Sequence, residues 1–118
     1  VHETSLLRQE PNQRRLGAGE VLFEVGDHAT HMYAVIEGEI EIVDGERVVE
    51  TVGPDEIFGE MAILDRRHAH PRSATARASA DTLLAEVDQE RFLRLVKLNP
   101  LFALTVMNRL ADRLRRGW

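Results

Sequence analysis

The sequence predicts a mainly β domain with helices: an antiparallel β-roll or jelly roll followed by two C-terminal helices. Short apolar or alternating runs between positions 21 and 87 are separated by turn signals, which is typical of antiparallel barrels and rolls. After Asp88, apolar residues recur at helical spacing instead. Strands do not alternate with long helical segments, which argues against a doubly wound parallel sheet.

The composition fits one small domain. Of the 118 residues, 43% are hydrophobic and 30% are charged, enough for one core and a well-solvated surface. The chain has no cysteine, which excludes disulfides and cysteine nucleophiles and fits an expected cytoplasmic location. The net charge of −5 disfavours a bulk electrostatic grip on nucleic acid, and we expect no membrane span because no apolar run is long enough.

Each expected strand is bounded by glycine or aspartate turns. Residues up to Arg15 are polar and weakly patterned, so we expect an irregular segment or a short helix there. Residues 39–43 alternate acidic and apolar side chains, which indicates a half-buried strand, and Asp44-Gly45 predicts a hairpin. In order, the expected strands are Val21–Phe23, Met32–Ile36, Glu39–Val43, Arg47–Val52, Ser73–Ala78 and Thr82–Val87.

Two helices are expected after the roll. Asp88 can cap a helix that runs to about Leu98, and Asn99-Pro100 favours the start of a second helix. The second helix has an apolar stripe (Phe102, Val106, Leu110, Leu114) and a basic end (Arg113, Arg115, Arg116) that complements the helix dipole. The stripe must be buried on the roll or on a partner, so a homodimer through this helix is one expected outcome.

The stretch from residue 58 to residue 75 points most directly to a ligand. Gly59 lets the backbone approach a ligand closely, and a short helix starting beside it would leave its first N–H groups for an anion. Glu60 is a suitable acceptor for the hydroxyls of a ribose, whereas the guanidinium of Arg72 suits phosphate oxygens. Ser73 adds a hydroxyl and an N–H. The competing interpretation is a structural salt bridge between Glu60 and Arg72.

Residues 17–116 resemble the cyclic-nucleotide-binding domain family. The matching segments are Ala18–Phe23, Gly26-Asp27, Met32-Tyr33, Glu37-Gly38, Phe58–Ala62 and Arg72–Thr75, and the tail from Phe92 to Arg115 resembles the family's closing helices. The resemblance implies an N-terminal extension over residues 1–16 and a nucleotide-binding domain over residues 17–118. Residues 58–75 would be its phosphate-binding cassette.

The resemblance also implies roles for single residues. Glu60, beside the Gly59 N–H, would bind the ribose 2′-hydroxyl, and Arg72 would pair with the cyclic phosphate. The N–H groups of Ala62 and Ser73 would complete the phosphate cradle, and the Ser73 hydroxyl could touch the phosphate or a guanine. Leu110, Leu114 or Trp118 would cover the base. The full expected ligand-binding set is Gly59, Glu60, Met61, Ala62, Arg72, Ser73 and Ala74.

These features predict a regulatory module that binds a cyclic nucleotide, either cAMP or cGMP. We do not expect an enzyme, and we expect neither a catalytic residue nor a cofactor beyond this ligand. Phosphate captured at Arg72 would pull the cassette inward and move the helices after Asp88, which would signal to an effector protein or domain. Only two residues follow Arg116, so we expect neither a DNA-reading helix-turn-helix nor direct binding of nucleic acid.

Three features depart from the family pattern. Arg66–His70 lengthen the loop between Met61 and Pro71, Asp55 stands where glycine is common, and the helical segment before the roll is short or absent. The longer loop supports an alternative, a degenerate β-roll that mediates interactions and binds no nucleotide.

A second alternative is a metal-dependent cupin-type enzyme that would use His68, His70 and the nearby Glu60. Pro71 and two arginines flank these histidines, which indicates a loop, so we interpret them as surface residues and expect no metal site.

Overall fold

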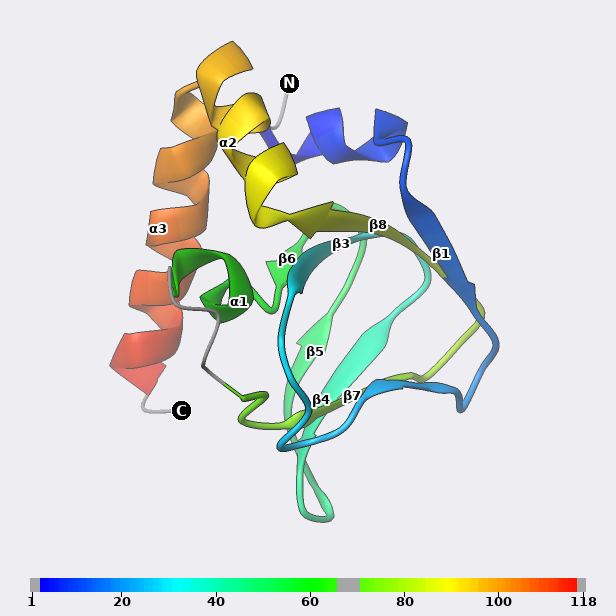
Figure 1. The fold of residues 1–118 in the computed structure, drawn as a ribbon. Helices are drawn as coiled ribbons and strands as arrows, with labels where there is room; N and C mark the ends of the chain where they lie inside the picture. Colours follow the sequence, from blue (N-terminus) through cyan, green and yellow to red (C-terminus); the bar gives the residue numbers. More distant parts are fainter. Residues whose placement is uncertain (1–2, 66–70, 117–118) are drawn as a thin grey trace.

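The computed structural model describes residues 3–65 and 71–116 and confirms the expected β-roll with C-terminal helices (Figure 1). Its strands form two four-stranded antiparallel sheets. The first sheet has the order β1 (Gln13–Leu16), β8 (Thr82–Asp88), β3 (His31–Glu37) and β6 (Ile57–Phe58). The second sheet has the order β2 (Val21–Phe23), β7 (Thr75–Ala78), β4 (Ile40–Asp44) and β5 (Arg47–Val52).

The first sheet is covered on both faces, which explains why β3 is apolar along nearly its whole length. Because side chains alternate along a strand, Tyr33 and Val35 point into the roll, where they meet residues of the second sheet such as Ile42. Met32 and Ala34 point the other way and pack with residues of the helices. The two faces therefore contribute to two separate clusters of the core.

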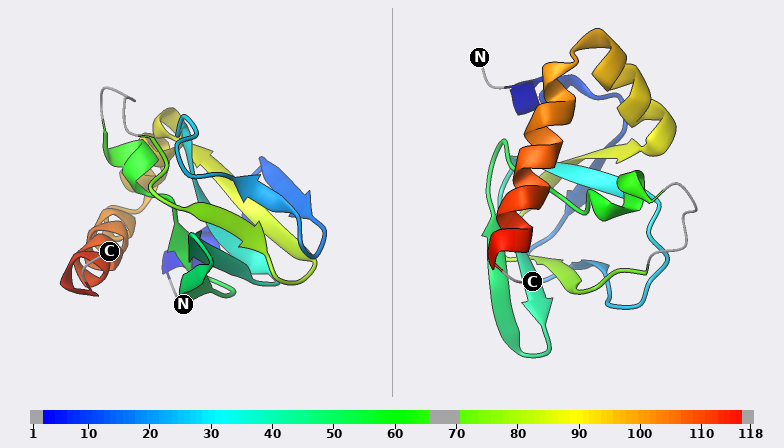
Figure 2. Two further views of the ribbon diagram at one scale, coloured as in Figure 1. Left: turned by 90° about the horizontal axis from the view of Figure 1, so that it is seen from below. Right: turned by 90° about the vertical axis from the view of Figure 1, so that its left-hand side faces the viewer.

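The helices cover the outer face of the first sheet (Figure 2). They are a 3₁₀ helix, η1 (Glu3–Gln9), a single turn, α1 (Met61–Leu64), and two longer helices, α2 (Gln89–Leu98) and α3 (Leu101–Arg116). The predicted cap of α2 is confirmed, because the Asp88 side chain accepts a hydrogen bond from the Arg91 N–H at 2.8 Å. Phe102 and Val106 of α3 are fully buried, which anchors the N-terminal half of that helix. None of the described helices is long and apolar enough to cross a membrane.

The N-terminal residues belong to the roll more closely than the sequence indicated. The short helix expected before the roll is present as η1, whose Leu7 is buried in the core, whereas β1, which pairs with β8, was not predicted. The sequence did not indicate this strand because β1 has a single apolar residue, Leu16, and its pairing partner lies far along the chain. β6 was also missed, because its two residues, Ile57 and Phe58, are too short for any periodicity.

Asp55 adopts the left-handed backbone conformation that glycine usually supplies, with φ of 67°. Aspartate tolerates this region better than most residues other than glycine. The side chain is also held by Arg8 of η1, whose Nε donates to the Asp55 carboxylate at 2.8 Å. Aspartate at this position thus takes the backbone conformation that a glycine would adopt at little cost.

Candidate functional site

Gly59 lies where the chain passes close to the Arg72 side chain. Its φ is 75°, and a Cβ at this position would lie 2.9 Å from the Arg72 Nη1 atom. Only glycine combines this conformation with this approach at little cost. The Gly59 carbonyl faces the guanidinium and accepts a hydrogen bond from Arg72 Nη1 at 3.3 Å.

Arg72 is fixed by a short antiparallel pairing with the turn at Gly26-Asp27. The Arg72 N–H donates to the Asp27 carbonyl at 2.8 Å, and the Gly26 N–H donates to the Arg72 carbonyl at 2.7 Å. An isolated bridge between His28 and Pro71 extends this pairing by one step. The turn predicted at Gly26-Asp27 thus positions the backbone of the predicted phosphate-binding arginine.

The Arg72 guanidinium is a buried cation with no carboxylate partner among the described residues. The residue is 7% exposed, and its Nη2 atom donates to the His31 carbonyl at 2.6 Å. Its Nε atom has no hydrogen-bond partner in the described part of the chain. Burial lowers the pKa of Arg72, because this environment solvates the charge poorly.

Aromatic rings supply part of the missing stabilisation. The Arg72 guanidinium carbon lies 4.0 Å from the centroid of the Phe23 ring and 5.7 Å from that of Tyr33. Such cation–π contacts favour the charged form but supply no hydrogen-bond acceptor for the Nε atom. The Tyr33 ring in turn stacks on Phe58, with centroids 5.3 Å apart.

Glu60 lies on the opposite side of the site and pairs with Arg113 of α3. The residue is 1% exposed, and its Oε1 atom accepts a hydrogen bond from Arg113 Nη1. Although Glu60 immediately precedes α1, its side chain makes no capping hydrogen bond to that helix. The Glu60 carboxylate therefore points to the side of the site that α3 covers.

Arg113 is held by a second buried carboxylate, Glu50 of β5. Its Nε and Nη2 atoms donate to the two carboxylate oxygens of Glu50 at 3.0 Å and 3.1 Å, and Nη2 also reaches the Ile57 carbonyl at 2.9 Å. Burial alone would lower the pKa of Arg113, but its hydrogen bonds with Glu50 and the charge of Glu60 raise it. Arg109 donates to Glu50 as well, and Arg116 lies 3.6 Å from it.

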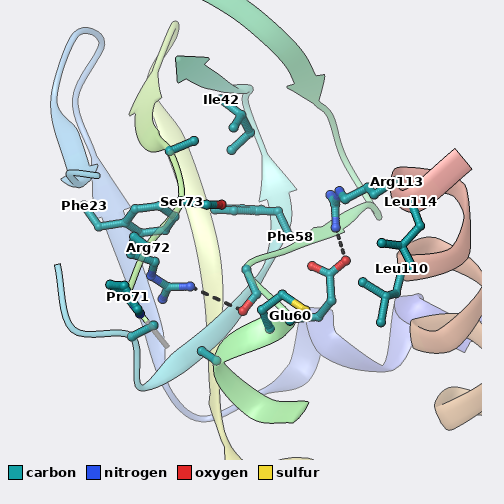
Figure 3. A pocket seen from close by; sticks show the side chains of 15 residues that line it. Phe23, Ile42, Phe58, Glu60, Pro71, Arg72, Ser73, Leu110, Arg113 and Leu114 are labelled. Carbon is teal, nitrogen blue, oxygen red and sulfur yellow. Dashed lines mark hydrogen bonds and ion pairs between the residues drawn. The ribbon is translucent and has the colours of Figure 1, made fainter. Parts of the chain in front are cut away.

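Arg72 and Glu60 both line a cavity of about 280 Å³, in which the guanidinium points to the Gly59 carbonyl and the carboxylate points to Arg113 (Figure 3). This volume lies near the lower end of the roughly 300–1,000 Å³ that small-molecule sites occupy. The structure brings the whole expected ligand-binding set to this one cavity: Gly59, Glu60, Met61, Ala62, Arg72, Ser73 and Ala74. The remaining wall is formed by Phe23, Ala29, Ile42, Phe58, Pro71, Leu110, Arg113 and Leu114. One wall is thus cationic, the opposite wall carries a carboxylate, and the rest is largely apolar.

Two further contacts bear on the competing salt-bridge interpretation and on the role predicted for Ala62. Glu60 and Arg72 form no ion pair with each other, since Glu60 pairs with Arg113 and Arg72 bonds to backbone carbonyls. The Ala62 N–H was expected to be free for an anion, but it donates to the Gly59 carbonyl at 3.2 Å. The reason is that α1 is a single turn whose tight entry bends the chain back on Gly59.

Other predictions at the site have different outcomes. Leu110 and Leu114 line the cavity as expected for lid residues, whereas Trp118 lies outside the described residues. The Arg66–His70 insertion, and with it the histidine pair of the cupin alternative, also lies outside them. Among the residues that are described, no group of histidine, aspartate and glutamate side chains could hold a metal ion.

Sequence reasoning missed the roles of Arg113, Glu50 and Phe23. Arg113 was interpreted only as a cation at a helix end. A signal did exist, because Glu50 occupies the same strand face as the buried Val52, and an acid in such a position requires a partner. Arg109, Arg113 and Arg116 follow one another at helical spacing, which could have suggested that partner.

Comparisons with known proteins agree on one family. The sequence profile of the cyclic nucleotide-binding domain matches residues 13–99. The chain is 38% identical over 111 residues to the cyclic AMP receptor protein of Thermus thermophilus, covering 89% of this chain and 50% of that protein. It is 36% identical over 85 residues to the cAMP-dependent protein kinase regulatory subunit of Dictyostelium discoideum, covering 65% of this chain and 25% of the subunit.

Solved structures show the same fold. A protein solved in work on a cyclic-GMP-dependent signalling pathway in bacterial phytopathogenesis superimposes with a TM-score of 0.83 and 32% identity, covering 100% of this chain and 96% of that one. The Thermus thermophilus catabolite activator protein superimposes with a TM-score of 0.81 and 32% identity, covering 98% and 55% of the two chains. The chain spans half or less of the length of the curated relatives described above.

Proposed function

The chain belongs to the cyclic nucleotide-binding domain family, and from this premise we propose that it is a regulatory module that binds cAMP or cGMP. The family is a regulatory, ligand-binding one and not a catalytic one. The proposed ligand lies in the cavity between Arg72 and Glu60, with its cyclic phosphate at Arg72 and its ribose at Glu60.

The observation that carries the proposal is the uncompensated charge of Arg72. A guanidinium stays protonated in proteins, and a buried cation is costly unless an anion pairs with it. Arg72 has backbone carbonyls, aromatic rings and an unpartnered Nε atom around it, but no carboxylate among the described residues. A phosphate oxygen would supply the missing charge-assisted hydrogen bonds.

The rest of the cavity suits the remainder of a nucleotide. Glu60 offers a carboxylate acceptor for a ribose hydroxyl, in a buried place where such a bond gains strength. Leu110, Leu114 and Ile42 offer apolar surface for a base. The Ser73 hydroxyl has no partner among the described residues and is free to contact phosphate or a guanine, so both nucleotides remain candidates.

We propose that α3 transmits the binding event, because it carries the lid side of the cavity. Leu110, Arg113 and Leu114 are the residues through which α3 touches the cavity, so a ligand there changes the contacts of this helix. The ligand shifts the population of α3 arrangements only as far as it binds one arrangement more tightly than another. The effector that senses this shift would be another domain or protein, in a cytoplasmic setting like that proposed from the sequence.

A second copy of the chain is a further proposed partner. Leu104, Met107, Ala111 and Leu114 follow the alternating three- and four-residue spacing of a two-stranded coiled coil. Leu104, Met107 and Leu114 are 58%, 52% and 69% exposed, so their apolar surface is available to a partner helix. A homodimer through α3 would bury this seam directly beside the cavity.

Calorimetric titration of the protein with cAMP and with cGMP tests the proposal. We expect saturable binding of at least one of them, with one site per chain. If neither nucleotide binds at millimolar concentration, the alternative of a degenerate β-roll that binds no nucleotide replaces the proposal.

A further inference from the structure

We propose that Tyr33 of β3 is a positioning residue that fixes the Arg72 guanidinium in the orientation that receives the phosphate. This inference rests on the proposed function, since it concerns the phosphate end of the same cavity. Tyr33 itself is not among the residues that line the cavity. It would therefore act on a ligand only through Arg72.

Tyr33 lies between the two backbone segments that accept hydrogen bonds from Arg72. The residue is 6% exposed, and its side chain belongs to the core inside the roll. His31, two positions earlier on β3, accepts from Arg72 Nη2 through its carbonyl at 2.6 Å. On the other side, Tyr33 is paired with Phe58 of β6, and the next residue, Gly59, accepts from Arg72 Nη1 at 3.3 Å. One side chain thus adjoins both acceptors.

The Tyr33 ring packs against both of these segments. It stacks on the Phe58 ring, with centroids 5.3 Å apart, and its centroid lies 6.4 Å from that of the His31 ring. A Cβ added at Gly59 would lie 3.6 Å from the Tyr33 Cδ2 atom, so the ring also lies beside the Gly59 backbone. Because protein interiors are close-packed and transmit strain, loss of the ring would shift the carbonyls that orient Arg72.

The guanidinium lies close to a pair of aromatic rings. Its carbon is 5.7 Å from the Tyr33 centroid and 4.0 Å from the Phe23 centroid, and the two ring centroids are 6.1 Å apart. Both distances to the guanidinium are within the range of a cation–π contact. Burial raises the pKa of Tyr33, and the charge of Arg72 opposes this rise, as expected for two groups that interact.

This arrangement leaves part of the guanidinium available in a fixed direction. Arginine carries several N–H donors in a rigid fork. The His31 and Gly59 carbonyls each take one donor, and the Nε atom has no partner in the described part of the chain. Since the two carbonyls and the rings set the plane of the fork, the Nε donor keeps its direction. A phosphate would then meet an arginine that is already ordered, which improves affinity by lowering the entropy lost on binding.

Two variants are matched controls for Tyr33→Leu. Tyr33→Phe keeps the ring and lacks only the hydroxyl, so it should preserve the position of Arg72. Val35 lies on the same face of β3, is 1% exposed and does not line the cavity. Val35→Ala therefore disturbs the same core cluster at a position farther along the strand from His31. A general loosening of the core and a specific effect on Arg72 can thus be separated.

The experiment measures the affinities of cAMP and of adenosine by calorimetry for the unmodified protein and these three variants. We expect the unmodified protein, Tyr33→Phe and Val35→Ala to share the same preference for cAMP over adenosine. In Tyr33→Leu this preference should fall by about three- to tenfold. The affinity for adenosine should stay the same, because adenosine lacks the phosphate. Far-UV circular dichroism checks that each variant is folded.

A second measurement needs no substitution of Tyr33, so it decides the matter even if Tyr33→Leu does not fold. Tyr33 is the only tyrosine in the chain, and an isotope label in tyrosine rings therefore reports on this residue alone. In NMR spectra we expect Arg72→Ala to shift the Tyr33 ring signals without any ligand. We also expect cAMP to shift them more than adenosine does in the unmodified protein. Ring signals that neither Arg72→Ala nor cAMP changes would overturn the proposal.

The outcomes separate this inference from the proposed function. If the unmodified protein binds neither cAMP nor cGMP, the proposed function fails and this inference fails with it. If the unmodified protein binds cAMP but Tyr33→Leu keeps the full preference over adenosine, only the role of Tyr33 is overturned. An equal loss of preference in Val35→Ala would overturn it by showing a general effect of the core. An equal loss in Tyr33→Phe would overturn the role of the ring.

Discussion

Glu50 should be the most important single charge for holding α3 on the roll, and Glu50→Gln tests this. The carboxylate side chain is 4% exposed and receives donors from Arg109 and Arg113, with Arg116 nearby. Removing one partner of a buried ion pair costs roughly 3–5 kcal/mol when the other charge is left alone. Here the loss should be smaller, because Arg113 keeps Glu60 and the Arg116 side chain is 49% exposed to water.

We therefore expect Glu50→Gln to lower the free energy of unfolding by about 2–3 kcal/mol, since glutamine keeps one acceptor but no charge. For a domain of this size, that corresponds to a fall in Tm of roughly 6–15 °C. The measurement is urea denaturation followed by circular dichroism, with the midpoint and the slope m compared.

The matched control is Glu41→Gln on the neighbouring strand of the same sheet. Glu41 pairs with Arg77 at 3.2 Å, but both side chains are partly exposed, at 27% and 43%. Such a pair contributes less than about 1 kcal/mol. If Glu50→Gln destabilised the protein no more than Glu41→Gln, the buried network would not anchor α3.

The remaining predictions concern Gly59 and Phe23 beside Arg72 and the proposed dimer contact of Met107. Gly59→Ala should cost on the order of 1–2 kcal/mol of stability and weaken nucleotide binding, because the new Cβ meets Arg72. The control Gly45→Ala, at a residue with a φ of 64° and open space around it, should leave nucleotide binding unchanged. Denaturation measures the stability of both variants, and calorimetry measures their nucleotide binding. Phe23→Leu removes the ring 4.0 Å from the guanidinium and should weaken cAMP binding by about three- to tenfold in calorimetry; unchanged affinity would show that the ring is not needed. Met107→Lys should shift the molecular mass in sedimentation from dimer to monomer and leave the far-UV circular dichroism spectrum unchanged, since the side chain is 52% exposed; a monomeric unmodified protein would contradict the seam.

Most of the fold could be predicted because its signals are local. The Asp88 cap and the hairpin between β4 and β5 depend on residues within a few positions of one another, and both are present. β1 could not be predicted from its own residues, because its strand state comes from pairing with β8 nearly 70 positions away. Propensity in such a segment is overridden by tertiary context.

In the candidate site, too, the local features could be predicted and the long-range contacts could not. Arg72 and Glu60 lie in a short stretch of sequence, and their residue types alone indicated phosphate and hydroxyl chemistry. Their true neighbours could not be inferred, because Arg113 reaches Glu60 across 53 positions and Glu50 across 63. Local reasoning placed Arg113 at a helix end, which is correct, but gave no reason for its burial.

The central claim is that Arg72 binds the phosphate of a cyclic nucleotide. The most direct test is calorimetry with cAMP and with adenosine. It compares the unmodified protein with Arg72→Ala and with the control Arg77→Ala. Adenosine keeps the base and the ribose but lacks the phosphate. We expect the unmodified protein and Arg77→Ala to prefer cAMP over adenosine, and Arg72→Ala to lose about 2–3 kcal/mol of cAMP binding with no loss for adenosine. Binding of cAMP by Arg72→Ala as tight as that of the unmodified protein would contradict the claim.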